Sequence, residues 1–283
     1  MVAVIEMGQA RAGENFSVAG RLLPATLRRD LLAIYAYARS VDDIGDEGSL
    51  AAPDRLAALA AVDADLDRLF AGEHPRLGFV AGLAGMVAAH RLPREPFADL
   101  VAANRQDQHV SSYASWAELR DYCRLSAEPV GRLVLGVVGA ATADRVAAAD
   151  RVCTGLQVVE HLQDVGEDAR AGRVYLPADD LARFGVATAD LTAPTSRREL
   201  RGLLAFEGAR ARDLLESGSM LVSSLRGAPR LAVAGFVAGG LAALDALAGA
   251  GWDVLVEQVR PRRSRTMALT ASLVARGTAG PRR

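Results

Sequence analysis

Four carboxylates close an apolar stretch early in the chain. They are Asp42, Asp43, Asp46 and Glu47, at the end of the segment AIYAYARSVDDIGDE. Residues four apart share a helix face, so Asp42 and Asp46 point one way while Asp43 and Glu47 are rotated from them. Like charges at this spacing repel each other, and a divalent cation offsets the repulsion. Arg39, one turn before Asp43, adds a fixed positive charge.

A second carboxylate face lies far down the chain. Glu160, Asp164 and Asp168 are again spaced by four, in an otherwise apolar stretch. One such cluster could be merely the solvated end of a helix, because short motifs give many false positives. Two clusters on two helices that look buried indicate a common charged partner, bound through metal ions.

The chemistry that these carboxylates predict is Mg²⁺ bound together with a diphosphate group. Mg²⁺ prefers oxygen ligands and is commonly held by one or two carboxylates plus substrate phosphates. Metal ions neutralise a diphosphate leaving group, and the resulting carbocation survives only in an apolar pocket that excludes water. Mn²⁺ is an alternative ion. Zinc and di-iron sites are disfavoured, because the histidines lack ligand spacing and no Glu-x-x-His pair occurs.

Helices are predicted to position these carboxylates. Ala, Leu and Val dominate a chain of 283 residues that is 51% hydrophobic and 5% aromatic, a composition that favours helix. Apolar residues recur at helical spacing, and Pro24, Pro53, Pro96 and Pro129 stand where helices are expected to begin. Residues 144–168 are predicted to form one long helix that ends in the second carboxylate face.

The predicted fold class is all-α, in a single domain over residues 1–283. Strand-like alternation is almost absent, and apolar residues on several helix faces suit a central bundle wrapped by other helices. The run at 231–248 is interpreted as a core helix, because Asp245 interrupts it. A further helix is expected at about 252–259. The Arg-rich segment 260–283 is expected to be a solvated, flexible tail, with attraction to anionic lipid headgroups as the second interpretation.

Composition also excludes several classes of function. A net charge of −1 gives no case for nucleic-acid binding, and the absence of lysine excludes Schiff-base and P-loop mechanisms. Cys123 and Cys153 read as buried free thiols. No signal-peptide core is seen at the N-terminus, so a cytoplasmic protein is expected, with peripheral contact at the inner face of the membrane as an addition. No nicotinamide-binding fingerprint is seen, so NADPH is not expected.

From about residue 15 to residue 259 the chain resembles the squalene/phytoene synthase family. The resemblance rests on the order of several segments: NF at 15–16, LP at 23–24, the first acidic stretch, YCRLSAEPVGR at 122–132, residues 157–168, GRVYLP at 172–177 and GWDVL at 251–255. The ENF, YCR and Gln163-Asp164 elements are most similar to the hopanoid-pathway branch of hydroxysqualene synthases, called HpnC. This resemblance implies a single isoprenoid-synthase-like bundle, with a central apolar cavity flanked by two Asp-rich helices.

The activity implied by that branch is Mg²⁺-dependent conversion of presqualene diphosphate to hydroxysqualene. Diphosphate leaves, the carbocation rearranges and water captures it. The alternative is head-to-head condensation of two prenyl diphosphates, such as farnesyl diphosphate, to presqualene diphosphate, squalene or phytoene. A non-catalytic assembly factor on the same fold is a third hypothesis, disfavoured because both acidic clusters are full. Neighbouring enzymes of the squalene and hopanoid pathway are the protein partners that the resemblance suggests.

The resemblance also implies roles for individual residues. Asp42, Asp46, Asp164 and Asp168 would bind metal ions, Asp43 would support them, and Arg39 would contact the diphosphate. Substrate contacts would come from Phe16, Tyr35, Gln157, Glu160, Gln163, Arg173 and Tyr175.

Asn15 stands where the family commonly has Ser, and two positions of the second acidic segment also depart from the family pattern. Many synthases have Asn where this chain has Glu160, and Arg where it has Gln163. Gln163 therefore removes one positive charge from the diphosphate site, and Glu160 adds a carboxylate that could bind a metal ion directly. These departures favour a one-substrate ionisation over a two-substrate condensation.

Overall fold

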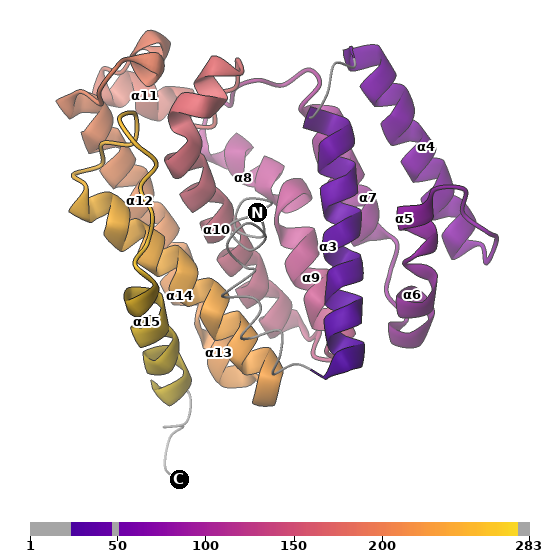
Figure 1. The fold of residues 1–283 in the computed structure, drawn as a ribbon. Coiled ribbons are helices and arrows are strands. Elements are labelled where there is room, and N and C mark those ends of the chain that lie inside the picture. Colours follow the sequence, from indigo (N-terminus) through magenta and orange to yellow (C-terminus); the bar gives the residue numbers. More distant parts are fainter. Residues whose placement is uncertain (1–23, 47–50, 277–283) are drawn as a thin grey trace. The chain divides into compact units, whose positions relative to one another are not determined.

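The computed structural model describes residues 24–46 and 51–276 (Figure 1). Of the described residues 76% are helical, and they form no β-strand, only an isolated bridge between Ser112 and Val174. The all-α prediction is therefore confirmed. Phe16 and Glu47 lie outside the described residues.

The chain divides into two compact units. Unit 1 comprises residues 1–110 and 122–146, and unit 2 comprises residues 111–121 and 147–283. The chain crosses between the units near residue 110 and again within helices α8 (Trp116–Ser126) and α10 (Ala143–Arg170). The single domain expected over the whole chain stays a prediction.

Unit 1 is built around helix α3 (Ala25–Asp46), which carries the first acidic stretch. Packed around it are α4 (Ala52–Phe70), α5 (Gly78–Ala81), α7 (Glu95–Gln106) and α9 (Glu128–Val137), and α6 (Ala84–His90) packs against α9. The fully buried Tyr37 donates a hydrogen bond of 2.9 Å to the carbonyl oxygen of Phe97, and their rings meet edge to face. A proline stands in the first turn of α4, α7 and α9, as the sequence predicts.

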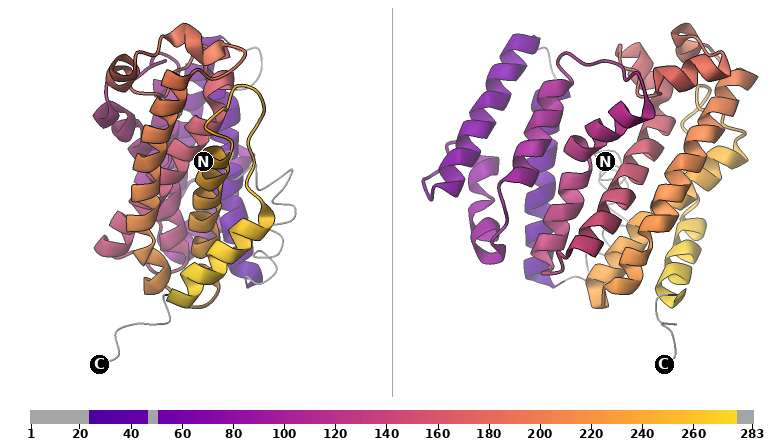
Figure 2. Two further views of the ribbon diagram at one scale, coloured as in Figure 1. Left: turned by 90° about the vertical axis from the view of Figure 1, so that its left-hand side faces the viewer. Right: turned by 180° about the vertical axis from the view of Figure 1, so that it is seen from behind.

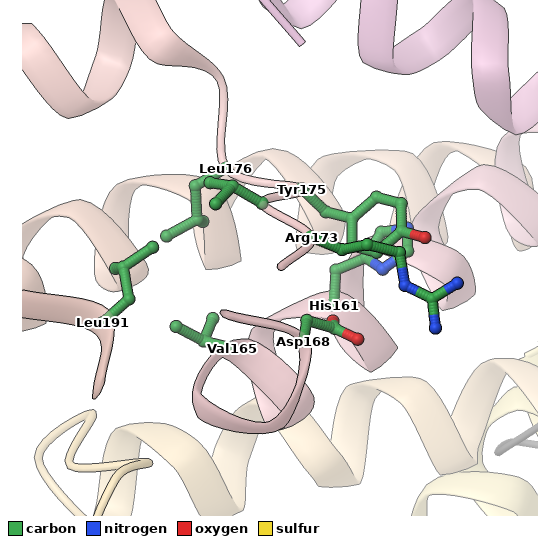
Figure 3. A pocket seen from close by; sticks show the side chains of 8 residues that line it. His161, Val165, Asp168, Arg173, Tyr175, Leu176 and Leu191 are labelled. Atoms are coloured by element: carbon green, nitrogen blue, oxygen red, sulfur yellow. The ribbon is translucent and has the colours of Figure 1, made fainter. Parts of the chain in front are cut away.

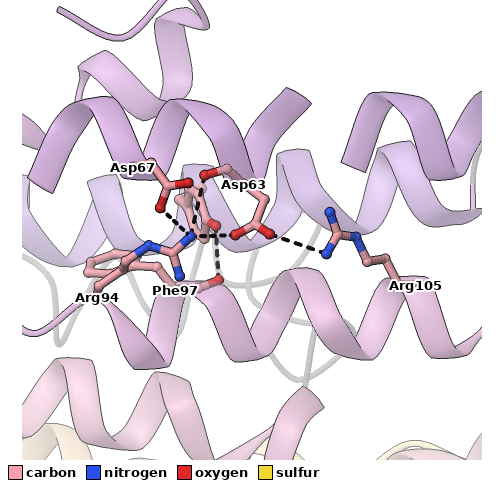
Figure 4. Close-up of polar contacts among 6 residues, drawn as sticks. Asp63, Asp67, Arg94, Phe97 and Arg105 are labelled. Atoms are coloured by element: carbon pink, nitrogen blue, oxygen red, sulfur yellow. Dashed lines mark hydrogen bonds and ion pairs between the residues drawn. The ribbon is translucent and has the colours of Figure 1, made fainter. Parts of the chain in front are cut away.

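An ion-pair network joins α4 to α7 (Figure 4). The guanidinium of Arg94 lies 2.6 Å from Asp63 and 2.8 Å from Asp67, and that of Arg105 lies 3.2 Å from Asp63. Asp63 and Asp67 are four residues apart, the same spacing as Asp42 and Asp46. Their charges are neutralised by arginine, so this pair reads as a structural ion-pair site rather than a metal site.

Unit 2 packs α10 against α12 (Arg198–Gly218) and α14 (Gly227–Gly249) through glycines. A Cβ on Gly155 of α10 would lie 3.1 Å from the carbonyl oxygen of Ala211. A Cβ on Gly218 of α12 would lie 2.9 Å from that of Ala148. The two helix backbones therefore approach more closely than any side chain at these positions would allow. Unit 2 also contains α11 (Ala178–Phe184), the 3₁₀ helix η1 (Thr188–Thr192), α13 (Met220–Ser224) and α15 (Arg263–Arg276).

A buried charged cluster joins α11 to α12 within unit 2. Glu207 is 1% exposed and Asp180 is 4% exposed. Arg210 forms ion pairs with both carboxylates, and its guanidinium lies over the rings of Trp116 and Phe206. Burial raises the pKa of Glu207 to about 7, with Arg210 lowering and Asp180 raising it. This cluster is a structural connection between the two helices.

The C-terminal part of the chain differs from the sequence expectation. Helix α15 covers Arg263–Arg276, where a flexible tail is expected, and no helix forms at 252–259. The half-buried Leu269 and Leu273 share the face of α15 that is turned inward, and α15 packs antiparallel against α14 (Figure 2). Arg265 bonds to Asp245 at 2.8 Å, and Arg230 bonds to the carbonyl oxygen of Val274. The arginines that favour a solvated tail in the sequence instead hold the helix against α14.

Helix α14 is long and apolar enough to cross a membrane by length and composition, and 56% of its most apolar window is buried within the protein. Asp245 within it pairs with Arg212 and Arg265. The burial and these ion pairs suit the core helix that the sequence predicts. Cys123 and Cys153 are buried thiols that form no disulfide, as expected.

Candidate active site

The first group of candidate residues is the acidic turn, defined as Asp42–Asp46 at the end of α3. The side-chain amide of Asn104, on α7, donates a hydrogen bond of 2.9 Å to Asp42. Arg39 forms an ion pair of 2.6 Å with Asp43. Asp42 and Asp43 are half-buried, while Asp46 is exposed. The amide of Asn104 and the guanidinium of Arg39 therefore both contact carboxylates of the acidic turn.

The backbone of the acidic turn is fixed by two side chains from other helices. Arg55 on α4 donates to the carbonyl oxygens of Gly45 and Asp46. Gln108, just beyond α7, donates to the carbonyl oxygen of Gly45 at 3.1 Å. The last carbonyls of a helix have no partner within the helix and carry partial negative charge. These donors therefore satisfy the helix end beside the carboxylates.

The electrostatics of the acidic turn favour a bound cation. Burial raises the pKa of Asp42 to about 6, the hydrogen bond from Asn104 lowers it, and nearby Asp46 raises it. A carboxylate held in such surroundings gains when a cation offsets its charge. The Asp63–Asp67 pair differs, because Arg94 and Arg105 already provide that offset.

The second group of candidate residues lies on α10 in unit 2. Glu160, Asp164 and Asp168 are half-buried on successive turns, and Gln157 is buried one turn earlier. The side-chain amide of Gln163 donates to the carbonyl oxygen of Val259 at 3.0 Å. That hydrogen bond ties the loop before α15 to α10. Gln163 thus has a structural contact in addition to the substrate contact implied by the resemblance.

A stack of rings lies beside this carboxylate face (Figure 3). The imidazole of His161 stacks on the ring of Tyr175 with centroids 3.8 Å apart. The ring of Tyr113 also stacks on that of Tyr175, with centroids 6.0 Å apart. Gln157 lies 3.4 Å from the imidazole. Burial lowers the pKa of His161 well below its usual value, and the charge of Arg173 lowers it further. The imidazole is therefore neutral at physiological pH.

Asp168, Arg173 and Tyr175 line a pocket together with His161 and Leu176 (Figure 3). The backbone N–H of Arg173 donates to the carbonyl oxygen of Asp168 at 2.8 Å, so the loop after α10 folds back onto the helix end. The pocket has a cavity volume of about 10 Å³, room for about one water molecule. Cavities that enclose drug-sized ligands are typically about 300–1,000 Å³. This pocket is therefore a local recess beside Asp168, not a chamber for a long prenyl chain.

The donor set in each unit fits Mg²⁺ bound with a phosphate ligand. Within the residues that the structure describes, no group of three or more His, Cys, Asp or Glu side chains converges as a metal cage. Mg²⁺ does not need such a cage, because one or two carboxylates plus substrate phosphates and water commonly complete its shell. Asp42 and Asp46, one helical turn apart, provide such a pair.

Several contacts of the site were not foreseen in the sequence. Asn104 and Gln108 are four residues apart, so they face α3 together, and Arg55 lies nine residues after Asp46 in the sequence. His161, which has no metal-ligand spacing in the sequence, is buried and stacks against Tyr175. The sequence signal for the contacts to the acidic turn is the pair of polar residues Asn104 and Gln108, four apart at the end of an apolar helix. Tyr35, expected to contact substrate, is half-buried on α3.

Comparison with known proteins identifies the class to which this all-α protein belongs. The squalene/phytoene synthase family model matches residues 9–267. A hydroxysqualene synthase of Sinorhizobium fredii is 36% identical over 214 residues, covering 75% of this chain and 72% of that one. A phytoene synthase of Arthrospira platensis is 33% identical over 216 residues, covering 72% and 69%. The crystal structure of squalene synthase HpnC from Alicyclobacillus acidocaldarius matches with 40% identity and a TM-score of 0.78, covering 88% of this chain and 93% of that one.

The chain therefore belongs to the squalene/phytoene synthase family. Within that family it is similar to hydroxysqualene synthases, as the sequence resemblance indicates. It is an enzyme that processes prenyl diphosphates, and its membership supports head-to-head prenyl diphosphate chemistry in general.

Proposed function

We propose that the protein converts presqualene diphosphate to hydroxysqualene. The carbon–oxygen bond to diphosphate breaks, the cation rearranges, and a water oxygen bonds to carbon and loses one proton. The observation that carries the proposal is the similarity to hydroxysqualene synthases at 34–36% identity. The acidic turn supports it, because its mutually repelling carboxylates, two of them half-buried, suit a metal–diphosphate partner.

The residues of this chain would act by binding and orientation. Asp42 and Asp46 in unit 1, with Asp43 in support, and Asp164 and Asp168 in unit 2 are proposed to hold Mg²⁺, which when bound would neutralise the departing diphosphate. Mn²⁺ is an alternative ion. Arg39 is proposed to contact the diphosphate while its ion pair with Asp43 fixes its direction. Glu160 is proposed as an added metal ligand. Substrate contacts remain proposed for Phe16, Tyr35, Gln157, Gln163, Arg173 and Tyr175.

Condensation of two prenyl diphosphates is the second candidate function, and the phytoene synthase relative at 33% identity favours it. The two candidates predict different substrates. When each diphosphate is offered alone with Mg²⁺, the proposed function predicts turnover of presqualene diphosphate and little or no turnover of farnesyl diphosphate. Turnover of farnesyl diphosphate with none of presqualene diphosphate would contradict the proposed function and support condensation.

We also propose that unit 2 contacts an anionic lipid surface at the inner face of the membrane, through α15 and the loop before it. Arg260, Arg262, Arg263 and Arg276 are exposed, and no acidic residue follows Glu257. Met267 is 71% exposed, and Ala268, Ala271 and Ala275 continue the same outer face. Exposed arginines flanking an apolar helix face are complementary to anionic headgroups above an apolar layer.

Vesicle flotation tests this contact. Replacing both Arg260 and Arg262 with Gln should weaken binding to anionic vesicles about 30-fold, since each basic residue near such a surface contributes about 1 kcal/mol. The matched control replaces the exposed Arg151 and Arg198 of the same unit with Gln, and we expect it to float like the unaltered protein. Equal recovery of both variants with the anionic vesicles, or equal binding of the unaltered protein to anionic and neutral vesicles, would overturn the proposed contact.

A further inference from the structure

Asn104 is a buried asparagine beside the acidic turn. Its side chain is 4% exposed, although asparagine is usually found at the protein surface. The amide nitrogen lies 2.9 Å from Oδ1 of Asp42 and 3.2 Å from the carbonyl oxygen of Leu100. An amide nitrogen donates two hydrogens, and both neighbours are acceptors. The orientation of the amide group is therefore fixed by its surroundings.

Gly45 provides the space in which this amide group lies. A Cβ on Gly45 would lie 2.0 Å from Oδ1 of Asn104, so no side chain could stand there without displacing the amide. Gln108 bonds both to the carbonyl oxygen of Gly45 and to that of Asn104. These contacts lock the last turn of α3 to the end of α7, with Asp42 at the junction.

We propose that Asn104 is a positioning residue for a divalent cation: its amide holds Oδ1 of Asp42 and leaves Oδ2 directed to the metal ion. This inference rests on the proposed function, in which Asp42 binds the ion. An amide is a neutral donor, so it orients the carboxylate without cancelling its charge. Arg94 at Asp63 is the contrasting case, because there a full positive charge takes the place that a cation would occupy.

The asparagines of this chain allow a direct test on the unaltered protein. Asn15 and Asn104 are its two asparagines, so selective ¹⁵N-asparagine labelling gives two side-chain amide signals, and replacing either residue assigns them. We expect one equivalent of Mn²⁺ with inorganic diphosphate to broaden the Asn104 signal beyond detection. An Asn104 signal that stays sharp while Mn²⁺ is bound would overturn the inference.

Metal dependence gives a second readout. Asn104→Leu removes the donor and should raise the Mg²⁺ concentration for half-maximal turnover about ten- to a hundredfold, the usual range for a residue that orients a metal ligand. Turnover at saturating Mg²⁺ should largely recover. Asp99→Asn is the comparison, because Asp99 lies on the same helix but its charge interacts with those of Arg132 and Glu95, and the half-saturating Mg²⁺ of this variant should change less than threefold. Equal shifts in both variants would mean that Asn104 has only a structural role.

Asp42→Ala separates failure of this inference from failure of the proposed function. If Asp42→Ala turns over substrate like the unaltered protein, the proposed function fails and the inference fails with it. If Asp42→Ala is inactive while Asn104→Leu keeps the metal dependence of the unaltered protein, only the inference fails. Loss of turnover in Asp42→Ala together with broadening of the Asn104 signal supports both.

Discussion

Asp42→Asn is expected to lower turnover by at least about a hundredfold while making the metal-free protein more stable at pH 8. The loss follows from removing a ligand charge that acts on the leaving group, for which about 10²–10³ is typical. The gain in stability follows from the raised pKa of the Asp42 carboxyl group. Because burial raises the pKa of Asp42 to about 6, the folded state binds the proton more tightly than the unfolded state. The free energy of unfolding therefore falls as pH rises from about 4 to about 6 and stays reduced above that range.

The matched control for this variant is Asp63→Asn, in the other carboxylate pair of unit 1. Asp63 is bonded to Arg94 and Arg105, so its replacement should lower stability by about 1 kcal/mol and leave turnover unchanged. Thermal melts in EDTA at pH 5 and pH 8, beside turnover with Mg²⁺, check both variants. At pH 8 the Asp42 variant should gain on the order of 1–2 kcal/mol. Full turnover by Asp42→Asn, or a loss of stability at pH 8, would contradict the assignment.

Glu207→Gln, in unit 2, is expected to raise the free energy of unfolding at pH 8. Burial raises the pKa of Glu207 to about 7 from its ordinary 4.5. Between these two pKa values the folded state keeps the proton of Glu207 while the unfolded state loses it. The free energy of unfolding of the unaltered protein should therefore fall by on the order of 2–3 kcal/mol between pH 4.5 and pH 8. Gln resembles the protonated carboxyl and can still accept a hydrogen bond from Arg210.

Chemical denaturation at pH 5 and pH 8 measures this effect. The Glu207→Gln variant should match the unaltered protein at pH 5 and exceed it at pH 8. Glu216→Gln, at an exposed position on the same helix, is the control and should change stability little at either pH. A Glu207→Gln variant that is less stable at pH 8 would show that the ion pair with Arg210 outweighs the cost of burying the charge.

Much of the fold could be predicted because its signals are local. Prolines mark the starts of α4, α7 and α9, and apolar spacing marks the length of α10. The C-terminal helix was missed because its stability comes from tertiary contacts. Arg265 reaches Asp245, and Arg230 reaches the backbone at Val274, across separations that no local pattern reveals.

The carboxylates of the site could be found in the sequence, but their supporting contacts could not. Spacing alone pairs Asp42 with Asp46, and it pairs Asp63 with Asp67 equally well. What separates the two pairs is the partner that folding brings to each, a neutral amide from Asn104 in one case and the guanidinium of Arg94 in the other. Those partners lie tens of residues away, so only a three-dimensional structure distinguishes the pair proposed to bind a metal ion from the pair that arginines neutralise.

The most direct test of the proposed function is the product formed from presqualene diphosphate. Purified protein would be incubated with this diphosphate and Mg²⁺ in ¹⁸O-labelled water, and the product identified by mass spectrometry. The proposed function predicts hydroxysqualene that carries the ¹⁸O label, with one diphosphate released per molecule. Unconsumed presqualene diphosphate, in a preparation that does consume farnesyl diphosphate, would contradict it.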